Sequence, residues 1–117
     1  MTSSIRIITA PISRAELRLI AQKSFGDMVK AVVDIERSIM AIGGELHADE
    51  EAVLLEQGSK QENLWGINLY PAESGEDWIE FDSMINIRPS QHNQTRSVEN
   101  PDVRKSIVAV VQQLIHD

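Results

Sequence analysis

The segment "MVKAVVDIERSIMAI", residues 28 to 42, constrains the fold most, because it forms either one long helix or a pair of strands. Its apolar residues also recur at helical spacing, and periodicity alone does not separate the two structures. Residues of the β-branched type favour strands, and four of them lie between residues 29 and 35: Val29, Val32, Val33 and Ile35. A helix would leave too few strands to cover the apolar faces that follow. We therefore predict a β-hairpin over residues 28–42, with a helix as the alternative.

Three further strands are expected. A short one around Ile5 to Thr9 opens the chain, and "LWGINLYP" forms another. In "WIEFDSMINIRP", apolar and polar residues alternate from Ile79 to Arg88. Such alternation is typical of an antiparallel strand with one buried face and one solvated face.

Capping residues predict three helices. Ser13 and Glu16 form a capping box in front of an apolar stripe that ends at Gly26. "HADEEAVLLEQG" has acidic residues in its first turn, where the helix dipole favours them. Asn100 followed by Pro101 starts the last helix, which runs to the end of the chain.

Together these segments predict an α+β fold in the order β-α-β-β-α-β-β-α, with residues 1–117 as a single domain. A chain of this length suits one hydrophobic core, and no linker or repeat divides it. We expect an antiparallel sheet of about four or five strands that carries the three helices mainly on one face. The other face is then open, and a site is expected there.

The charge distribution excludes several partners. The formal net charge is −7, and residues 45–82 hold eleven acidic residues against one basic residue, Lys60. Such a surface repels nucleic acid, whose binding depends on Lys and Arg contacts with phosphates. No secretory signal, membrane-spanning run or cysteine is present, so a cytoplasmic, prokaryote-like setting without membrane contact is expected.

Two stretches resemble a family of small uncharacterised prokaryotic proteins, a domain of unknown function. They are "GGELHADEEAVLLEQGSKQENLWGIN" and "MINIRPSQHNQTRSVENPDVR", and the resemblance extends from about Val29 to Leu114. It implies a single domain and brings no activity with it. The positions that match the family pattern are His47, Asp49, Glu51, Gly58, Ser59, Gln61, Trp65, Gly66, Asn68, Asn86, Arg88, Pro89 and Asn93.

His47 and Glu51 are the candidates for a metal or acid–base site. They are four residues apart, so they share one helix face. A third ligand would have to come from another element, with Asp34 or Glu36 available. The favoured interpretation is that these residues cap and solvate a helix, and no metal or other cofactor is expected.

The solvated sheet face is the second candidate. Asparagine is a poor strand former, so its presence in two strands needs a reason, which is a ligand, a buried water or the edge of a neighbouring strand. An arginine beside it suits a small anionic ligand. The alternative is a solvated face with an internal ion pair. The expected ligand-binding residues are Arg88, Asn86, Asn68, Gln91, Asn93, Asp34 and Glu36.

Arg88 is the central residue of this hypothesis, and its replacement by Met is expected to cost under about 1 kcal/mol if it lies on an open face. The function expected overall is a small non-enzymatic binding or protein-interaction module that self-associates into a homo-oligomer. The alternative is a small metal-dependent or acid–base hydrolase that uses His47, Glu51 and the pair Asp34 and Glu36.

Overall fold

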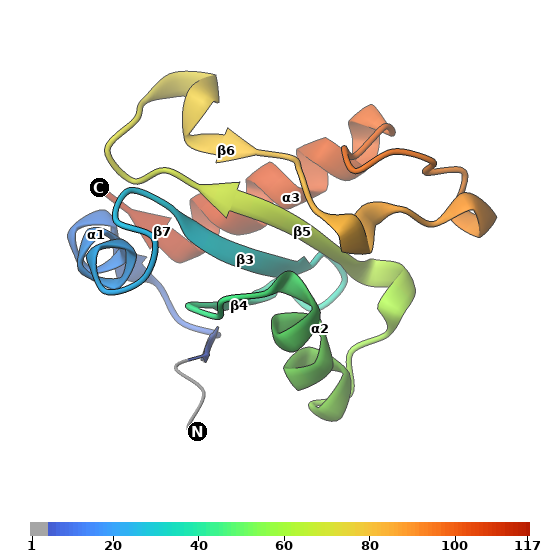
Figure 1. Cartoon of the computed structure of the whole chain (residues 1–117), viewed down its shortest axis with the longest axis horizontal. Coiled ribbons are helices and arrows are strands. Elements are labelled where there is room, and N and C mark those ends of the chain that lie inside the picture. The colour runs from blue at the N-terminus through green and yellow to red at the C-terminus, as the bar shows by residue number, and fades with distance from the viewer. Residues whose placement is uncertain (1–4) are drawn as a thin grey trace.

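A computed structural model describes residues 5–117 as an α+β domain built on one antiparallel sheet (Figure 1). The sheet has five strands in the order β1-β4-β3-β5-β6. These strands are β1 (Arg6–Ile8), β4 (Ile39–Ile42), β3 (Val29–Asp34), β5 (Leu64–Leu69) and β6 (Ile79–Glu80). Two short strands, β2 (Ile12–Ser13) and β7 (Ile115–His116), pair in parallel and join the two ends of the chain.

Three α-helices and four short 3-10 helices complete the fold. The α-helices are α1 (Arg14–Gln22), α2 (His47–Glu56) and α3 (Pro101–Leu114). The 3-10 helices are η1 (Gln61–Asn63), η2 (Gly75–Trp78), η3 (Met84–Asn86) and η4 (Pro89–Gln91). No helix within residues 5–117 is long and apolar enough to cross a membrane.

The hairpin predicted for residues 28–42 is confirmed as β3 and β4, which pair antiparallel from Ala31 with Ile42 to Asp34 with Ile39. Asp34 stabilises the turn, because its Oδ1 accepts the backbone N–H groups of Glu36 (2.9 Å) and Arg37 (3.0 Å). Val29 and Val33 of β3 pack on one face of the sheet, and Val32 packs on the other.

The predicted helix starts are also confirmed where a capping side chain is present. The Oγ of Ser13 accepts the Glu16 N–H at 3.0 Å, and the Oδ1 of Asn100 accepts the Asp102 N–H at 2.8 Å. Helix α2 starts differently, since Leu46 precedes it without a side-chain cap.

The helices lie mainly on one face, as predicted, but the other face is not open. Helices α1 and α3 pack on one face through Leu17, Ile107 and Val111, whereas α2 packs on the other through Leu54 (Figure 1). Leu54 joins a second, smaller core with the sheet residues Val32 and Leu64. The face that we expected to be open is therefore partly covered.

The long strand predicted for residues 78–89 is wrong, because β6 ends at Glu80 and the chain then leaves the sheet. Beyond it, the side-chain amide of Asn86 takes the place of a strand. Its Oδ1 accepts the Gly66 N–H at 2.8 Å and its Nδ2 donates to the Gly66 carbonyl at 2.9 Å. A side-chain amide carries the same donor and acceptor as a peptide group, so it satisfies the free edge of β5.

Gly66 allows this arrangement by having no side chain. A Cβ atom at this position would lie 2.5 Å from the Cβ of Ser83. Glycine inside a strand often marks such a close approach. The crossing of Ser83 over Gly66 therefore fixes where the chain leaves the sheet.

Candidate functional site

Arg88 is buried rather than displayed on an open face, with 9% of the residue exposed. Its guanidinium donates to the main-chain carbonyls of Gln61 and Leu64. It also stacks on the ring of Trp65, 4.2 Å from the ring centroid. These contacts tie the segment that follows η3 to the start of β5.

The other predicted residues of this segment also organise the backbone. Asn93 is 3% exposed, and its Nδ2 donates to the carbonyls of Asn86 (2.7 Å) and Ser97 (2.7 Å). Gln91 donates to the Glu62 carbonyl at 3.1 Å. The segment is therefore a cross-linked structural unit.

Asp34 and Glu36 make no hydrogen bond with Arg88, Gln91 or Asn93 in the described chain. Asp34 is fully buried, and besides capping its turn it accepts the Ser59 hydroxyl at 2.6 Å. Glu36 is exposed. The structure does not bring either residue to the predicted ligand site.

His47 and Glu51 have no third metal ligand placed beside them among residues 5–117. His47 faces β5, whereas the Oε2 of Glu51 is buried without a hydrogen-bond partner among residues 5–117. Asp34 pairs with Leu64, and this position is three residues along β5 from the His47 contact at Ile67, or roughly 10 Å. Within the described part of the chain, no group of three His, Cys, Asp or Glu residues is placed to hold a metal.

A different set of polar side chains meets on the face covered by α2. Lys30, Asn68 and Glu80 lie opposite one another on the neighbouring strands β3, β5 and β6. Directly opposed residues on adjacent strands share a face and lie within contact distance. We call these three residues the polar row.

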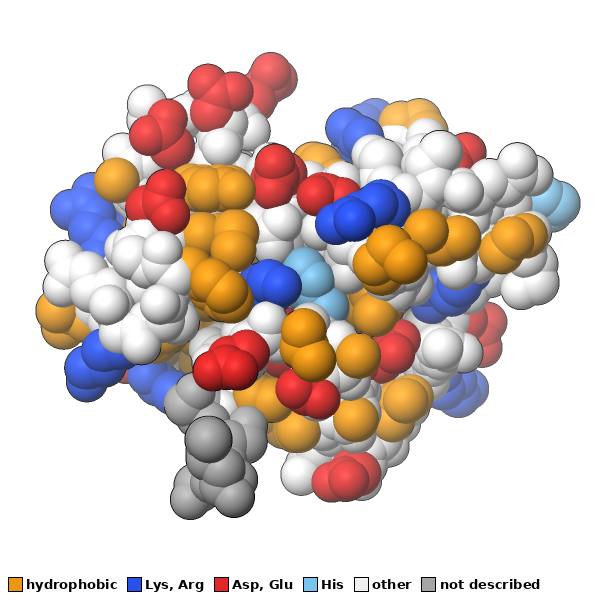
Figure 2. All heavy atoms as spheres, viewed as in Figure 1, with side chains coloured by type: hydrophobic (Ala, Val, Ile, Leu, Met, Phe, Trp, Pro, Cys, Tyr) orange, Lys and Arg blue, Asp and Glu red, His pale blue; other side chains and the backbone are white. Residues whose placement is uncertain are grey.

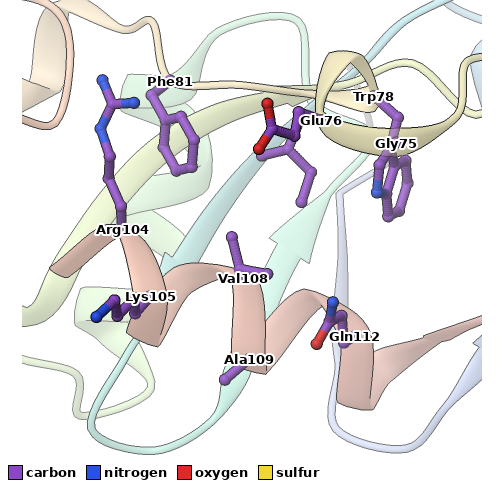
Figure 3. Close-up of a pocket in the computed structure, with 10 residues that line it drawn as sticks. Gly75, Glu76, Trp78, Phe81, Arg104, Lys105, Val108, Ala109 and Gln112 are labelled. Atoms are coloured by element: carbon purple, nitrogen blue, oxygen red, sulfur yellow. The ribbon is translucent and has the colours of Figure 1, made fainter. Parts of the chain in front are cut away.

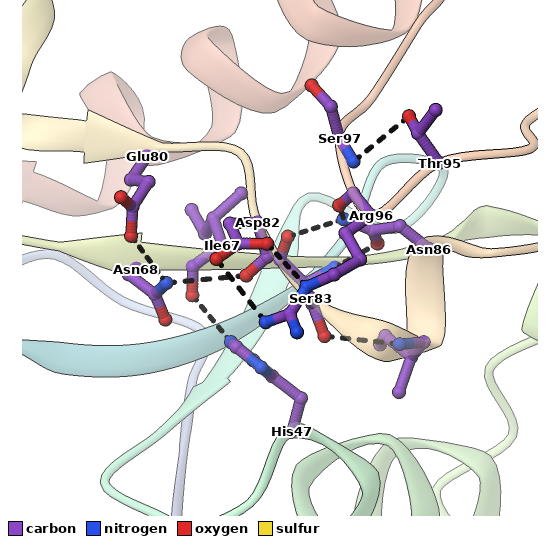
Figure 4. Close-up of polar contacts among 12 residues, drawn as sticks. His47, Ile67, Asn68, Glu80, Asp82, Ser83, Asn86, Thr95, Arg96 and Ser97 are labelled. Carbon is purple, nitrogen blue, oxygen red and sulfur yellow. Dashed lines mark hydrogen bonds and ion pairs between the residues drawn. The ribbon is translucent and has the colours of Figure 1, made fainter.

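Asn68 is the centre of the polar row and is 6% exposed. Its Nδ2 donates to the carboxylate of Glu80 at 2.8 Å and to the carbonyl of Asp82 at 3.3 Å (Figure 4). These two bonds fix the orientation of the amide. Its Oδ1 is buried and has no hydrogen-bond partner among residues 5–117. An acceptor left in this state costs about 1–3 kcal/mol.

His47 enters the same region from the first turn of α2 (Figure 4). Its Nε2 lies 2.8 Å from the carbonyl of Ile67. A carbonyl only accepts, so Nε2 carries the proton and Nδ1 holds a lone pair when the ring is neutral. Burial lowers the pKa of His47, which favours that neutral form near neutral pH.

Glu50 lies one helical turn beyond His47 and is fully buried. Its Oε2 accepts the Gly44 N–H at 2.9 Å, and its Oε1 has no partner in the described chain. Burial raises the pKa of Glu50 to about 9. The carboxyl is therefore protonated at neutral pH, and α2 presents no negative charge from this residue to the sheet.

The rim of the site carries further polar groups. The hydroxyl of Tyr70 donates to Glu80 at 3.2 Å, and Arg96 pairs with Asp82 at 2.7 Å. Figure 2 shows a basic side chain beside a histidine in the middle of this face, bordered by acidic groups above and below. The ammonium of Lys30 has no ion pair within residues 5–117 and lies 5.2 Å from the centroid of the Phe25 ring.

The sequence singled out His47 and Asn68 separately, and the alternation after Ile79 placed Glu80 on the same solvated face as Asn68. Glu80 was not among the expected ligand-binding residues, and Lys30 was missed. Lys30 is identified as a site residue by the register of β3 with β5, which places it opposite Asn68. That register was not predictable without knowing which strand β5 joins. Among residues 5–117, the site combines the ammonium of Lys30, which has no ion pair there, with the acceptors of Asn68, His47 and Glu80.

Comparison with known proteins identifies the family of the chain. No curated protein and no solved structure matches the chain significantly. One family model matches residues 6–114, which is nearly the whole domain. The chain therefore belongs to a family of proteins of unknown function, DUF5674.

Proposed function

We propose that this protein is a small binding module whose ligand is a low-molecular-weight metabolite carrying both an amino group and a carboxylate. The ligand occupies the polar row below the first turn of α2. The observation that carries the proposal is the buried Oδ1 of Asn68, an oriented acceptor without a donor.

The charges of the polar row support this class of ligand. Lys30 and Glu80 stand on either side of Asn68, two strand spacings or roughly 10 Å apart. An ammonium group of the ligand would donate to Asn68 and Glu80. Its carboxylate would face Lys30. The lone pair of His47 would accept a further N–H or O–H group.

Access to the Asn68 acceptor depends on Lys30. Lys30 is only partly buried and is the cross-strand neighbour of Asn68. Lysine side chains are long and flexible, so this is the group that would move when a ligand donor arrives. The carboxylate of the ligand would then hold the ammonium in its new position.

Isothermal titration calorimetry tests the proposal with the proteinogenic amino acids as ligands. Matched amines and carboxylic acids that carry only one of the two groups serve as comparisons. We expect at least one amino acid to bind, and each single-group analogue to bind about tenfold more weakly, as for the loss of one charged hydrogen bond. Equal binding of the single-group analogues, or no binding by any amino acid, would contradict the proposal.

Variants locate the binding site. Lys30→Met and Glu80→Gln each remove one charge of the polar row, and both should weaken binding about tenfold. Lys60→Met removes a comparable charge from an exposed position elsewhere and should leave binding unchanged. An effect of Lys60→Met as large as that of Lys30→Met would show that net charge, not the site, governs binding.

Self-association is the second proposal, and it is supported by large apolar side chains exposed on the same face. Leu46 is 56% exposed, Met84 65% and Ile87 38%. Exposed apolar clusters commonly mark interaction sites. Sedimentation equilibrium should show a dimer that Met84→Glu dissociates, whereas a monomer at all concentrations would contradict this second proposal.

A further inference from the structure

The outer edge of β6 pairs with no further strand among residues 5–117. β6 is the last strand of the sheet, and the Trp78 carbonyl accepts the Tyr70 N–H at 2.8 Å on its inner side. Polar backbone groups alternate between the two sides of a strand. The N–H and C=O groups of Ile79 therefore point away from β5, toward the side where the described sheet has no further strand, and Phe81 follows directly after the end of β6.

A groove of about 730 Å³ runs between this edge and α3 (Figure 3). This volume is within the range of ordinary ligand sites. Figure 3 shows the rings of Phe81 and Trp78 on one side of the groove and Val108 pointing into it from α3. The groove therefore has an apolar centre, formed by Trp78, Phe81 and Val108, and adjoins a strand edge.

One end of the groove carries two basic side chains, Arg104 and Lys105. At the Phe81 end, the Arg104 guanidinium stacks on the Phe81 ring at 4.6 Å and donates to the Val98 carbonyl at 2.5 Å. Lys105 is next to it on α3 and has no ion pair among residues 5–117. Glu76 lies between Phe81 and Trp78 on the wall opposite α3 (Figure 3). A cationic end is unusual in a chain with a net charge of −7.

We propose that the groove binds an extended segment of a partner protein. The segment adds a strand to the outer edge of β6, places an apolar side chain between Phe81 and Val108, and directs a carboxylate to Lys105. Strand addition next to a helix combines main-chain hydrogen bonds, which give affinity, with a side-chain pocket, which gives specificity. Both features are present here.

A second copy of the chain fits the groove poorly. Pairing of β6 with β6 would bring two identical acidic segments together, and residues 73–82 contain five acidic residues and no basic one. Like charges placed opposite each other across strands are destabilising. The partner segment is therefore expected to come from a different protein.

This interface is independent of the polar row. Glu80 projects to the face covered by α2, whereas Ile79 and Phe81 pack with the core on the opposite face. A variant in the groove should therefore leave amino-acid binding unchanged.

An NMR titration of the full chain tests the proposal. The probe is an N-acetylated pentapeptide of alternating valine and threonine that ends in leucine with a free carboxylate. We expect saturable shifts of the Ile79 and Phe81 amides, and slower hydrogen exchange at both. The same peptide with a C-terminal amide should bind about fivefold more weakly, as for the loss of one exposed ion pair.

Two variants complete the test. Lys105→Gln should weaken the acid peptide about fivefold without affecting the amide peptide. Ala109→Trp fills the groove from an exposed position of α3 and should abolish the shifts while the spectrum stays folded. The proposal is overturned by absence of saturation at millimolar peptide, by binding that survives Ala109→Trp, or by β6 shifts that follow protein concentration without peptide. The last result would identify a second copy as the occupant.

Discussion

The buried carboxyl of Glu50 makes the stability of the fold depend on pH in a direction opposite to that of most carboxyl groups. Burial raises its pKa from 4.5 to about 9, so the folded protein keeps a proton that the unfolded chain releases between these values. Stability therefore falls as the pH rises through this window. Glutamine has the shape of the protonated side chain and does not titrate, so Glu50→Gln should remove this dependence.

The magnitude follows from the width of the window. A pH of 7 lies about 2.5 units above 4.5, and at about 1.36 kcal/mol per unit the folded state loses about 3 kcal/mol relative to acidic pH. Glu50→Gln should thus match the wild type near pH 4.5 and exceed its stability by about 3 kcal/mol at pH 7. The Gly44 N–H keeps an acceptor in the variant, since the amide oxygen can replace Oε2.

Urea unfolding between pH 4.5 and 9 measures this difference. Glu56→Gln is the control, because it neutralises an exposed residue of the same helix and should leave the pH dependence of the wild type in place. If the free energy of unfolding changes with pH in the same way for Glu50→Gln and the wild type, the reasoning is refuted, since Glu50 would then be ionised in the folded protein.

Three further predictions concern the scaffold and can be measured by urea unfolding unless another assay is named. Arg88→Met should cost about 3 kcal/mol, because two carbonyls lose their donor, and a loss below about 1 kcal/mol would contradict the buried geometry. Gly66→Ala should cost about 1–3 kcal/mol through its collision with Ser83, and the added change Ser83→Gly should recover part of the loss. Burial lowers the pKa of His47, so the free energy of unfolding should decrease as the pH falls below about 6.5, and His47→Gln should not show this decrease. An NMR titration of the ring that gives an unshifted pKa would contradict this.

Local signals were sufficient to predict most elements. The caps at Ser13 and Asn100 are short-range hydrogen bonds, so the residues that form them are adjacent in sequence. The hairpin of β3 and β4 followed from β-branched residues that pack on both faces. In each case, the decisive interaction joins residues close together in the chain.

The failure at residues 78–89 has a long-range cause. The alternation from Ile79 to Arg88 is compatible with a strand, but Asn86 and Arg88 use their side chains to satisfy the edge of β5. That contact joins residues about twenty positions apart, and Gly66 permits it. The sequence marked all three residues as unusual without showing that their role was structural.

The candidate site depends on the same kind of information. His47 and Asn68 were both singled out, but they meet only because α2 packs on the face that we expected to be open. Lys30 and Glu80 join them through strand register. The local alternation placed Glu80 on the solvated face, but a register is set by the packing of the whole sheet, so the position of Lys30 opposite Asn68 was not identifiable from local pattern.

The proposal that the polar row binds an amino-acid ligand is tested most directly by an NMR titration that follows the side-chain amide of Asn68 and the ring of His47. With the amino acid that binds most tightly in calorimetry, both sets of signals should shift and saturate together, and Lys30→Met should weaken the response about tenfold. Chemical-shift changes that leave the signals of Asn68 and His47 unaffected, or that persist unchanged in Lys30→Met, would contradict the proposed site.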